Sequence, residues 1–155
     1  MGKGDPIIAT ASQMLEPVTT TPQTPPRNYL AVANALMPGV KALAVGPLSA
    51  CSLALLAAHA LECMLSAYLS RNGSDADLRK PGLLHNIVGL WGQAVADGLP
   101  VQSTPPDWVE DLSRVHVKPF HLRYMRGLNG ILLPAPEPMA TELAELLEVV
   151  KTAIK

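Results

Sequence analysis

Basic residues gather in one stretch of the chain, between positions 114 and 126. No Asp or Glu interrupts this stretch, which contains Arg114, His116, Lys118, His121, Arg123 and Arg126. Guanidinium forks and imidazoles bind phosphate oxygens through charge-assisted hydrogen bonds. The residues from Lys118 onward are therefore candidates for a patch that binds nucleotide or phosphate.

An alternative use of these arginines is structural. Arg123 and Arg126 could pair with acids inside the fold, such as Glu62, Glu110 or Asp111. The formal net charge of the chain is −1 at pH 7. The chain as a whole therefore lacks the excess of positive charge that attracts nucleic acid. The balanced charge favours the structural pairing.

A second group of residues with metal-ligand chemistry lies on one predicted helix. His59 and Glu62 are one helical turn apart, and His59 and Cys63 are four residues apart, so two ligands could face one ion. The other histidines show no ligand spacing, so we expect no metal and no cofactor. We expect instead a buried polar network of His59, Glu62 and His85, because a buried carboxylate needs a partner. Arg123 or Arg126 is the expected partner of Glu62.

The helix that carries this group runs from Pro47 to Arg71 in our prediction. It is apolar almost all the way round, apart from one narrow stripe of Ser49, Ser52, His59, Glu62, Ser66 and Ser70. Such a helix is surrounded either by other helices or by lipid. An ionised residue in mid-membrane costs about 3 kcal/mol, and His59 and Glu62 lie near the middle. We therefore expect a bundle core and no membrane association.

The remaining chain predicts further helices and no sheet, since no stretch alternates with period two. A first helix is interrupted or kinked at Pro38-Gly39, and another begins after a cap at Thr104. A break follows at 115–119. The helices are expected over 27–43, 47–71, 84–96, 105–114 and 138–154, with 120–133 ambiguous. The fold class is thus an all-α antiparallel bundle of about five helices.

The first 26 residues read as a separate tail, and residues 27–155 as a single domain. Four prolines and four threonines lie between Glu16 and Pro26, a composition typical of disorder. Cys51 and Cys63 are the only cysteines, and twelve residues of helix keep them too far apart to bridge. Free thiols and the absence of an apolar leader predict a cytoplasmic protein.

Three segments of the ordered chain resemble the HEPN family of small helical domains. Residues 57–69, Ala-Ala-His-Ala-Leu-Glu-Cys-Met-Leu-Ser-Ala-Tyr-Leu, are similar to its second helix, with Ser66 in place of the usual Lys. Residues 85–90, with Gly98-Leu99 downstream, resemble the start and end of its third helix. Leu122-Arg123-Tyr124 resembles its Arg-Tyr-Pro turn, with Met125 where Pro is common.

This resemblance implies a homodimer that binds nucleotide or RNA, with a partner such as a small nucleotidyltransferase in a toxin–antitoxin pair. Many family members are metal-independent RNases in which a gap of four to six residues separates an arginine from a following histidine. Arg79 with His85, and Arg114 with His121, have that spacing, but prolines interrupt both pairs. We therefore expect a non-catalytic module. Arg114, His121 and Arg123 remain the candidates for an RNase, and an unrelated interaction bundle is the third alternative.

Overall fold

The computed structural model describes residues 24–46, 50–124 and 130–154. Within these residues the chain is helical and forms no strand, which confirms the all-α prediction. The elements are α2 (Pro25–Val45), α3 (Ala50–Leu69), the 3₁₀ turn η1 (Ala76–Arg79), α4 (Ile87–Ala96), α5 (Asp107–His116), the short α6 (His121–Tyr124) and α7 (Pro136–Ala153).

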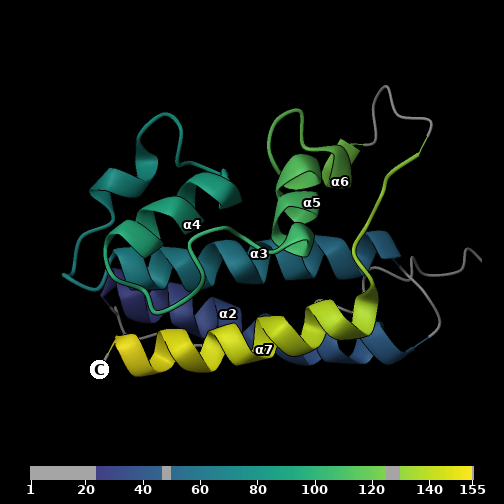
Figure 1. Cartoon of the computed structure of the whole chain (residues 1–155), viewed down its shortest axis with the longest axis horizontal. Helices are drawn as coiled ribbons and strands as arrows, with labels where there is room; N and C mark the ends of the chain where they lie inside the picture. Colours follow the sequence, from purple (N-terminus) through teal and green to yellow (C-terminus); the bar gives the residue numbers. More distant parts are fainter. Residues whose placement is uncertain (1–23, 47–49, 125–129, 155) are drawn as a thin grey trace, which may run out of the picture.

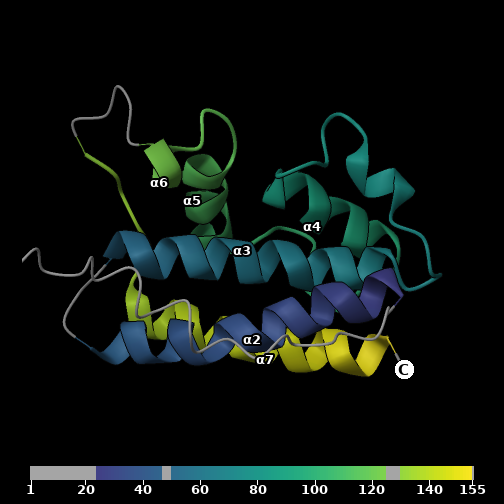
Figure 2. The same ribbon diagram turned by 180° about the vertical axis from the view of Figure 1, so that it is seen from behind.

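Helix α3 lies in the middle of the molecule. The long helices α2 and α7 pack along one side of it, while α4, α5 and α6 lie on the opposite side (Figures 1 and 2). α2, α3 and α7 all contact one another, and α4 and α5 also touch. Helices α4 and α5 therefore lie on the same side of α3.

The composition of α3 explains its central place. Twelve of its residues are buried, including Leu61, Met64 and Leu65, none of which exposes any side-chain area. Among the described residues, α3 is the only helix long and apolar enough to cross a membrane. Its apolar surface is instead covered by helices on both sides, so its hydropathy follows from its place in the core.

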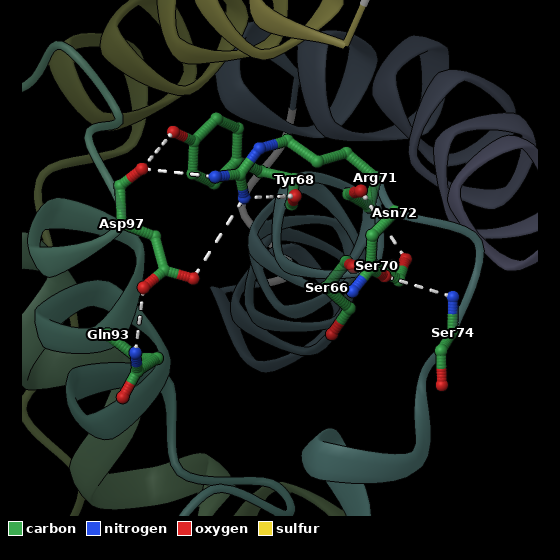
Figure 3. Close-up of polar contacts among 9 residues, drawn as sticks. Ser66, Tyr68, Ser70, Arg71, Asn72, Ser74, Gln93 and Asp97 are labelled. Atoms are coloured by element: carbon green, nitrogen blue, oxygen red, sulfur yellow. Dashed lines mark hydrogen bonds and ion pairs between the residues drawn. The ribbon is translucent and has the colours of Figure 1, made fainter.

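Polar contacts fix the end of α3 to the end of α4. The Tyr68 hydroxyl donates to the Asp97 carbonyl at 2.9 Å, and the Arg71 guanidinium donates to the same carbonyl at 3.1 Å. Arg71 also lies over the Tyr68 ring, 4.2 Å from its centre (Figure 3). These contacts hold α4 against α3 at the end remote from His85.

Three local predictions differ from the structure. Helix α2 continues through Pro38 without a break, because packing along α3 outweighs the backbone hydrogen bond that proline cannot donate. Helix α5 begins at Asp107 after Pro106, so Thr104 is not its cap. The predicted break at residue 115 is also wrong, since α5 continues to His116.

The predicted tail falls mostly outside the described residues. Residues 1–23 are not described, whereas Pro25 and Pro26 already belong to α2, where proline suits the first turn. Residues 47–49, the predicted start of the central helix, also lie outside. The C-terminal helix begins at Pro136, two residues earlier than expected.

Candidate functional site: a Glu–His–His centre

The Glu62 side chain on α3 is held between two histidines. Its Oε1 atom lies 3.0 Å from Nδ1 of His85, and its Oε2 atom lies 2.7 Å from Nε2 of His116. An ionised carboxylate only accepts hydrogen bonds, so both imidazoles donate to it through N–H groups. Three chain segments that are far apart in sequence therefore meet at one carboxylate.

His85 reaches Glu62 because its backbone takes a left-handed conformation, with φ of 59°. Such a conformation is costly for a non-glycine residue and is found mainly where the surrounding structure enforces it. The next residue, Asn86, caps α4 by accepting from the Gly89 N–H, and donates to the Gly82 carbonyl at 2.7 Å. Asn86 rather than His85 is thus the cap of α4, and His85 is free to turn toward α3.

His116 is the last residue of α5, and its side chain is only 1% exposed. One turn earlier, the Ser113 hydroxyl accepts from the Val88 N–H of α4 at 3.4 Å. This contact joins the end of α5 to the start of α4. The rings of His85 and His116 also meet edge to face, with centres 6.1 Å apart.

The surroundings of Glu62 favour its ionised form. Burial alone raises the pKa of a carboxyl group, but the hydrogen bond and charge of His116, followed by those of His85, outweigh it and lower the pKa of Glu62 below its usual value. The carboxylate is thus available at neutral pH as a hydrogen-bond acceptor or as a metal ligand.

His59 lies one helical turn before Glu62, but it does not join the hydrogen-bonded group. Its Nδ1 atom is buried and has no hydrogen-bond partner. Burial lowers the pKa of the His59 imidazole, and the positive side chains nearby act in the same direction, against the opposing charge of Glu62. His59 is therefore a neutral imidazole at pH 7 with a buried nitrogen that lacks a partner.

A cavity of about 410 Å³ adjoins this group. His59, Glu62 and His85 line it together with η1, the loop before α4, and Tyr29 of α2. The three residues of the predicted polar network therefore share one cavity. His116 also contacts this group, through its hydrogen bond with Glu62, but it is not one of the residues that line the cavity.

The Glu–His–His centre has the composition of a metal site. One nitrogen of each imidazole and one carboxylate oxygen lie within 4.8 Å of one another. Two histidines and a carboxylate form a common ligand set for Zn²⁺ in sites that keep a coordination position open. Because His85 is 35% exposed at the cavity, while His116 is buried, the open side of such a site would face the cavity.

The predicted pairing of Glu62 with an arginine is wrong among the described residues. The partners of Glu62 are histidines, and Arg123 instead lies over the Phe120 ring, 5.3 Å from its centre. Arg126, the other predicted partner, lies outside the described residues. Glu110 and Asp111 do pair with an arginine, but with Arg114 of their own helix.

Over its described residues, 114–124, the basic stretch does not form one continuous patch. His116 points into the core, whereas Lys118 and Arg123 are exposed. Arg114 and His121 line a common hollow of about 260 Å³, which also contains Asp111. Nδ1 of His121 is buried without a hydrogen-bond partner. Of the described candidates in the basic stretch, only Arg114 and His121 line the same hollow.

His116 is the residue that sequence reasoning placed in the wrong group. The sequence alone places it in the basic stretch, because Arg114, Lys118 and His121 surround it. Its position on α5 offered one signal, since it follows Val109, Leu112 and Val115 at helical spacing, and these three side chains are buried. A histidine on the apolar face of a helix needs a polar partner in the core.

Comparison of this chain with protein-family models, with curated proteins and with solved structures finds no match.

Proposed function

We propose that this protein binds a divalent transition-metal ion at Glu62, His85 and His116, and that the ion faces the adjoining cavity. The observation that carries the proposal is the convergence of three ligand atoms within 4.8 Å of one another, next to a cavity. Zn²⁺ fits the donor set best, since it favours imidazole nitrogen with a carboxylate at distances of about 2.0–2.2 Å. A bound ion would act as a Lewis acid for a ligand in the cavity.

Two features of the structure support a binding role over a purely structural one. His85 is held in a left-handed conformation, which is a feature of ligand clamps. A hydrogen-bonded structural network also gives no reason for a 410 Å³ cavity at its open side.

Metal binding can be measured directly on the purified protein. After removal of metal with a chelator and addition of ZnCl₂, we expect one zinc per chain by atomic emission, with a titration endpoint of one equivalent in calorimetry. Glu62→Gln and His85→Ala should each weaken zinc binding by about tenfold or more, since each removes a ligand. Circular dichroism shows whether each variant is folded.

Glu148→Gln is a matched control, because Glu148 is an exposed carboxylate on α7 that pairs only with Lys151 in the structure. It should bind zinc like the parent protein. Equal zinc affinity in the parent and in folded Glu62→Gln would contradict the proposal, and would leave the centre as a structural hydrogen-bond network.

A second candidate function is the binding or cleavage of RNA by a HEPN-like homodimer. The observation that favours it is the common hollow of Arg114 and His121, where the His121 Nδ1 atom has no partner. The acids Glu110 and Asp111 hold Arg114, which weakens its attraction for phosphate. Lys118 and Arg123 would supply further phosphate contacts from the exposed surface.

Together with this second candidate we propose a nucleotidyltransferase partner, a role in a toxin–antitoxin pair and a cytoplasmic location. Incubation of the chelator-treated protein with RNA tests it. Cleavage that is lost in His121→Ala and Arg114→Ala, but kept in Lys151→Ala on α7, would support the RNase. RNA that stays intact and unbound in a gel-shift measurement would contradict both the RNase and the RNA-binding module.

A further inference from the structure

The cavity beside the Glu–His–His centre has walls of two kinds. One part is polar, with His59, Glu62 and His85 from α3 and the loop before α4. The other part is formed by four leucines from η1, that loop and α4, which are Leu78, Leu83, Leu84 and Leu90. Its volume of about 410 Å³ is within the range of sites for small molecules.

The charges around the cavity favour an anion once a divalent ion is bound. Among the described residues that line the cavity, Glu62 is the only carboxylate and Arg79 the only guanidinium. A divalent ion bound by one carboxylate and two neutral imidazoles keeps one positive charge, and Arg79 adds another. Asp75, which lies 3.4 Å from Arg79, offsets one of these charges. The field in the cavity thus remains positive.

His59 adds a polar side chain to the wall of the cavity. Its Nδ1 atom is buried, lacks a hydrogen-bond partner and belongs to a side chain that lines the cavity. Buried polar atoms in native structures nearly always have a partner. The His59 Nδ1 atom is thus an exception to this rule, in a side chain that lines the cavity.

We propose that the cavity binds a small organic anion, whose acidic group lies between the metal ion and Arg79 and whose apolar body lies against the leucines. The inference rests on the proposed metal site, because the ion supplies most of the positive charge. Phosphate monoesters and carboxylates share the required chemistry, an anionic head of several oxygens on an apolar body. The His59 side chain of α3 belongs to the polar part of the same cavity wall.

Calorimetric titration of the zinc-loaded protein with phenyl phosphate tests this inference, with benzoate to compare the two kinds of acid. Phenyl phosphate should bind at least about tenfold more tightly than inorganic phosphate, which lacks the apolar body, and than phenol, which lacks the charge. Binding should be lost or weakened by about tenfold in the chelator-treated protein. Tighter binding of benzoate than of phenyl phosphate would assign the site to carboxylates.

Arg79→Gln should weaken phenyl phosphate binding by about tenfold, since a charge-assisted hydrogen bond is removed. Lys80→Gln is the matched control, because Lys80 is the neighbouring exposed cation, pairs with Asp77 and does not line this cavity. Its affinity for phenyl phosphate should equal that of the parent.

The outcomes separate the two proposals. If one zinc is retained but phenyl phosphate does not bind, or binds no better than phenol, the anion site is overturned and the metal site stands. If zinc is not retained and phenyl phosphate does not bind, both are overturned. Equal weakening by Arg79→Gln and Lys80→Gln would show general surface attraction and would overturn the role of Arg79.

Discussion

At the scale of residues, the histidines of the site differ in whether their ring nitrogens have hydrogen-bond partners. His85 and His116 donate to the two oxygens of Glu62, whereas His59 and His121 each keep a buried Nδ1 atom without a partner. Buried polar atoms are costly unless they are hydrogen-bonded. The Nδ1 atoms of His59 and His121 are therefore costly exceptions to this rule among the described residues.

The stability of the metal-free protein should fall as pH is lowered from 7 to 5, in part because of His59. Burial lowers the pKa of the folded His59 imidazole below the ordinary value of about 6.5. Below that value the unfolded chain takes up a proton that the folded chain does not, so acid favours unfolding. The carboxylate of Glu62 opposes this shift, while His116, Arg123 and His85 add to it.

Urea denaturation at pH 7, 6 and 5, in the parent protein and in His59→Asn, measures this contribution. The variant has no imidazole at this position, so its stability should fall less between pH 7 and pH 5. The lowered pKa of Glu62 acts mainly below pH 4.5, outside this window. An unchanged pH dependence in the variant would show that His59 titrates like a solvated histidine.

At the scale of elements, the loop from Lys80 to Asn86 and the start of α4 position His85. Asn86 connects them through its hydrogen bonds to Gly82 and Gly89. The backbone of Gly82 passes so close to Gly89 that a Cβ atom at Gly89 would lie 2.7 Å from the Gly82 carbonyl oxygen. The absence of a side chain at Gly89 is therefore a condition for the position of His85.

Gly89→Ala should destabilise the protein and weaken zinc binding, although alanine favours helices. The new methyl group meets the Gly82 carbonyl and the Asn86 amide, so the loop must move and displace His85. Gly92→Ala, in the same helix, is the control, since nothing lies within 4 Å of its Cβ position. It should stabilise α4 by about 0.5–1 kcal/mol. Urea denaturation and zinc calorimetry measure both effects, and similar behaviour of the two variants would contradict the close-approach argument.

At the scale of the whole molecule, α3 is the centre of the core and carries the site. One side of it packs against α2 and α7, and the other supports the loops of α4 and α5 (Figure 1). The Glu62 and His59 side chains lie on the side that faces the α4–α5 layer. Stability and the geometry of the site thus depend on the same helix.

Leu61→Ala should destabilise the protein by about 2–5 kcal/mol, because Leu61 is completely buried and its loss leaves a cavity. Leu132→Ala, at a position that is 78% exposed, should change stability by less than about 0.5 kcal/mol. The free energy of unfolding in urea gives both values. Equal effects of the two substitutions would contradict the central position of α3.

The sequence alone was sufficient for the all-α class, for the position of most helices and for the importance of α3. Helical periodicity and the narrow polar stripe are local properties, and local pattern determines which face of a helix is buried. The stripe also identified His59 and Glu62 as residues that share a face. These predictions succeed because they need only residues that are close in sequence.

The partners of Glu62 were decided by the tertiary structure. His85 follows a loop and His116 ends a different helix, 23 and 54 residues away from Glu62. Their approach depends on the left-handed turn at His85 and on the packing of α5 against α4. The helical periodicity of a sequence does not show which residues come into contact when they are far apart in the chain. The fold therefore divides a basic stretch that is continuous in sequence, because His116 is a buried partner of Glu62, whereas Arg114, Lys118 and Arg123 are exposed.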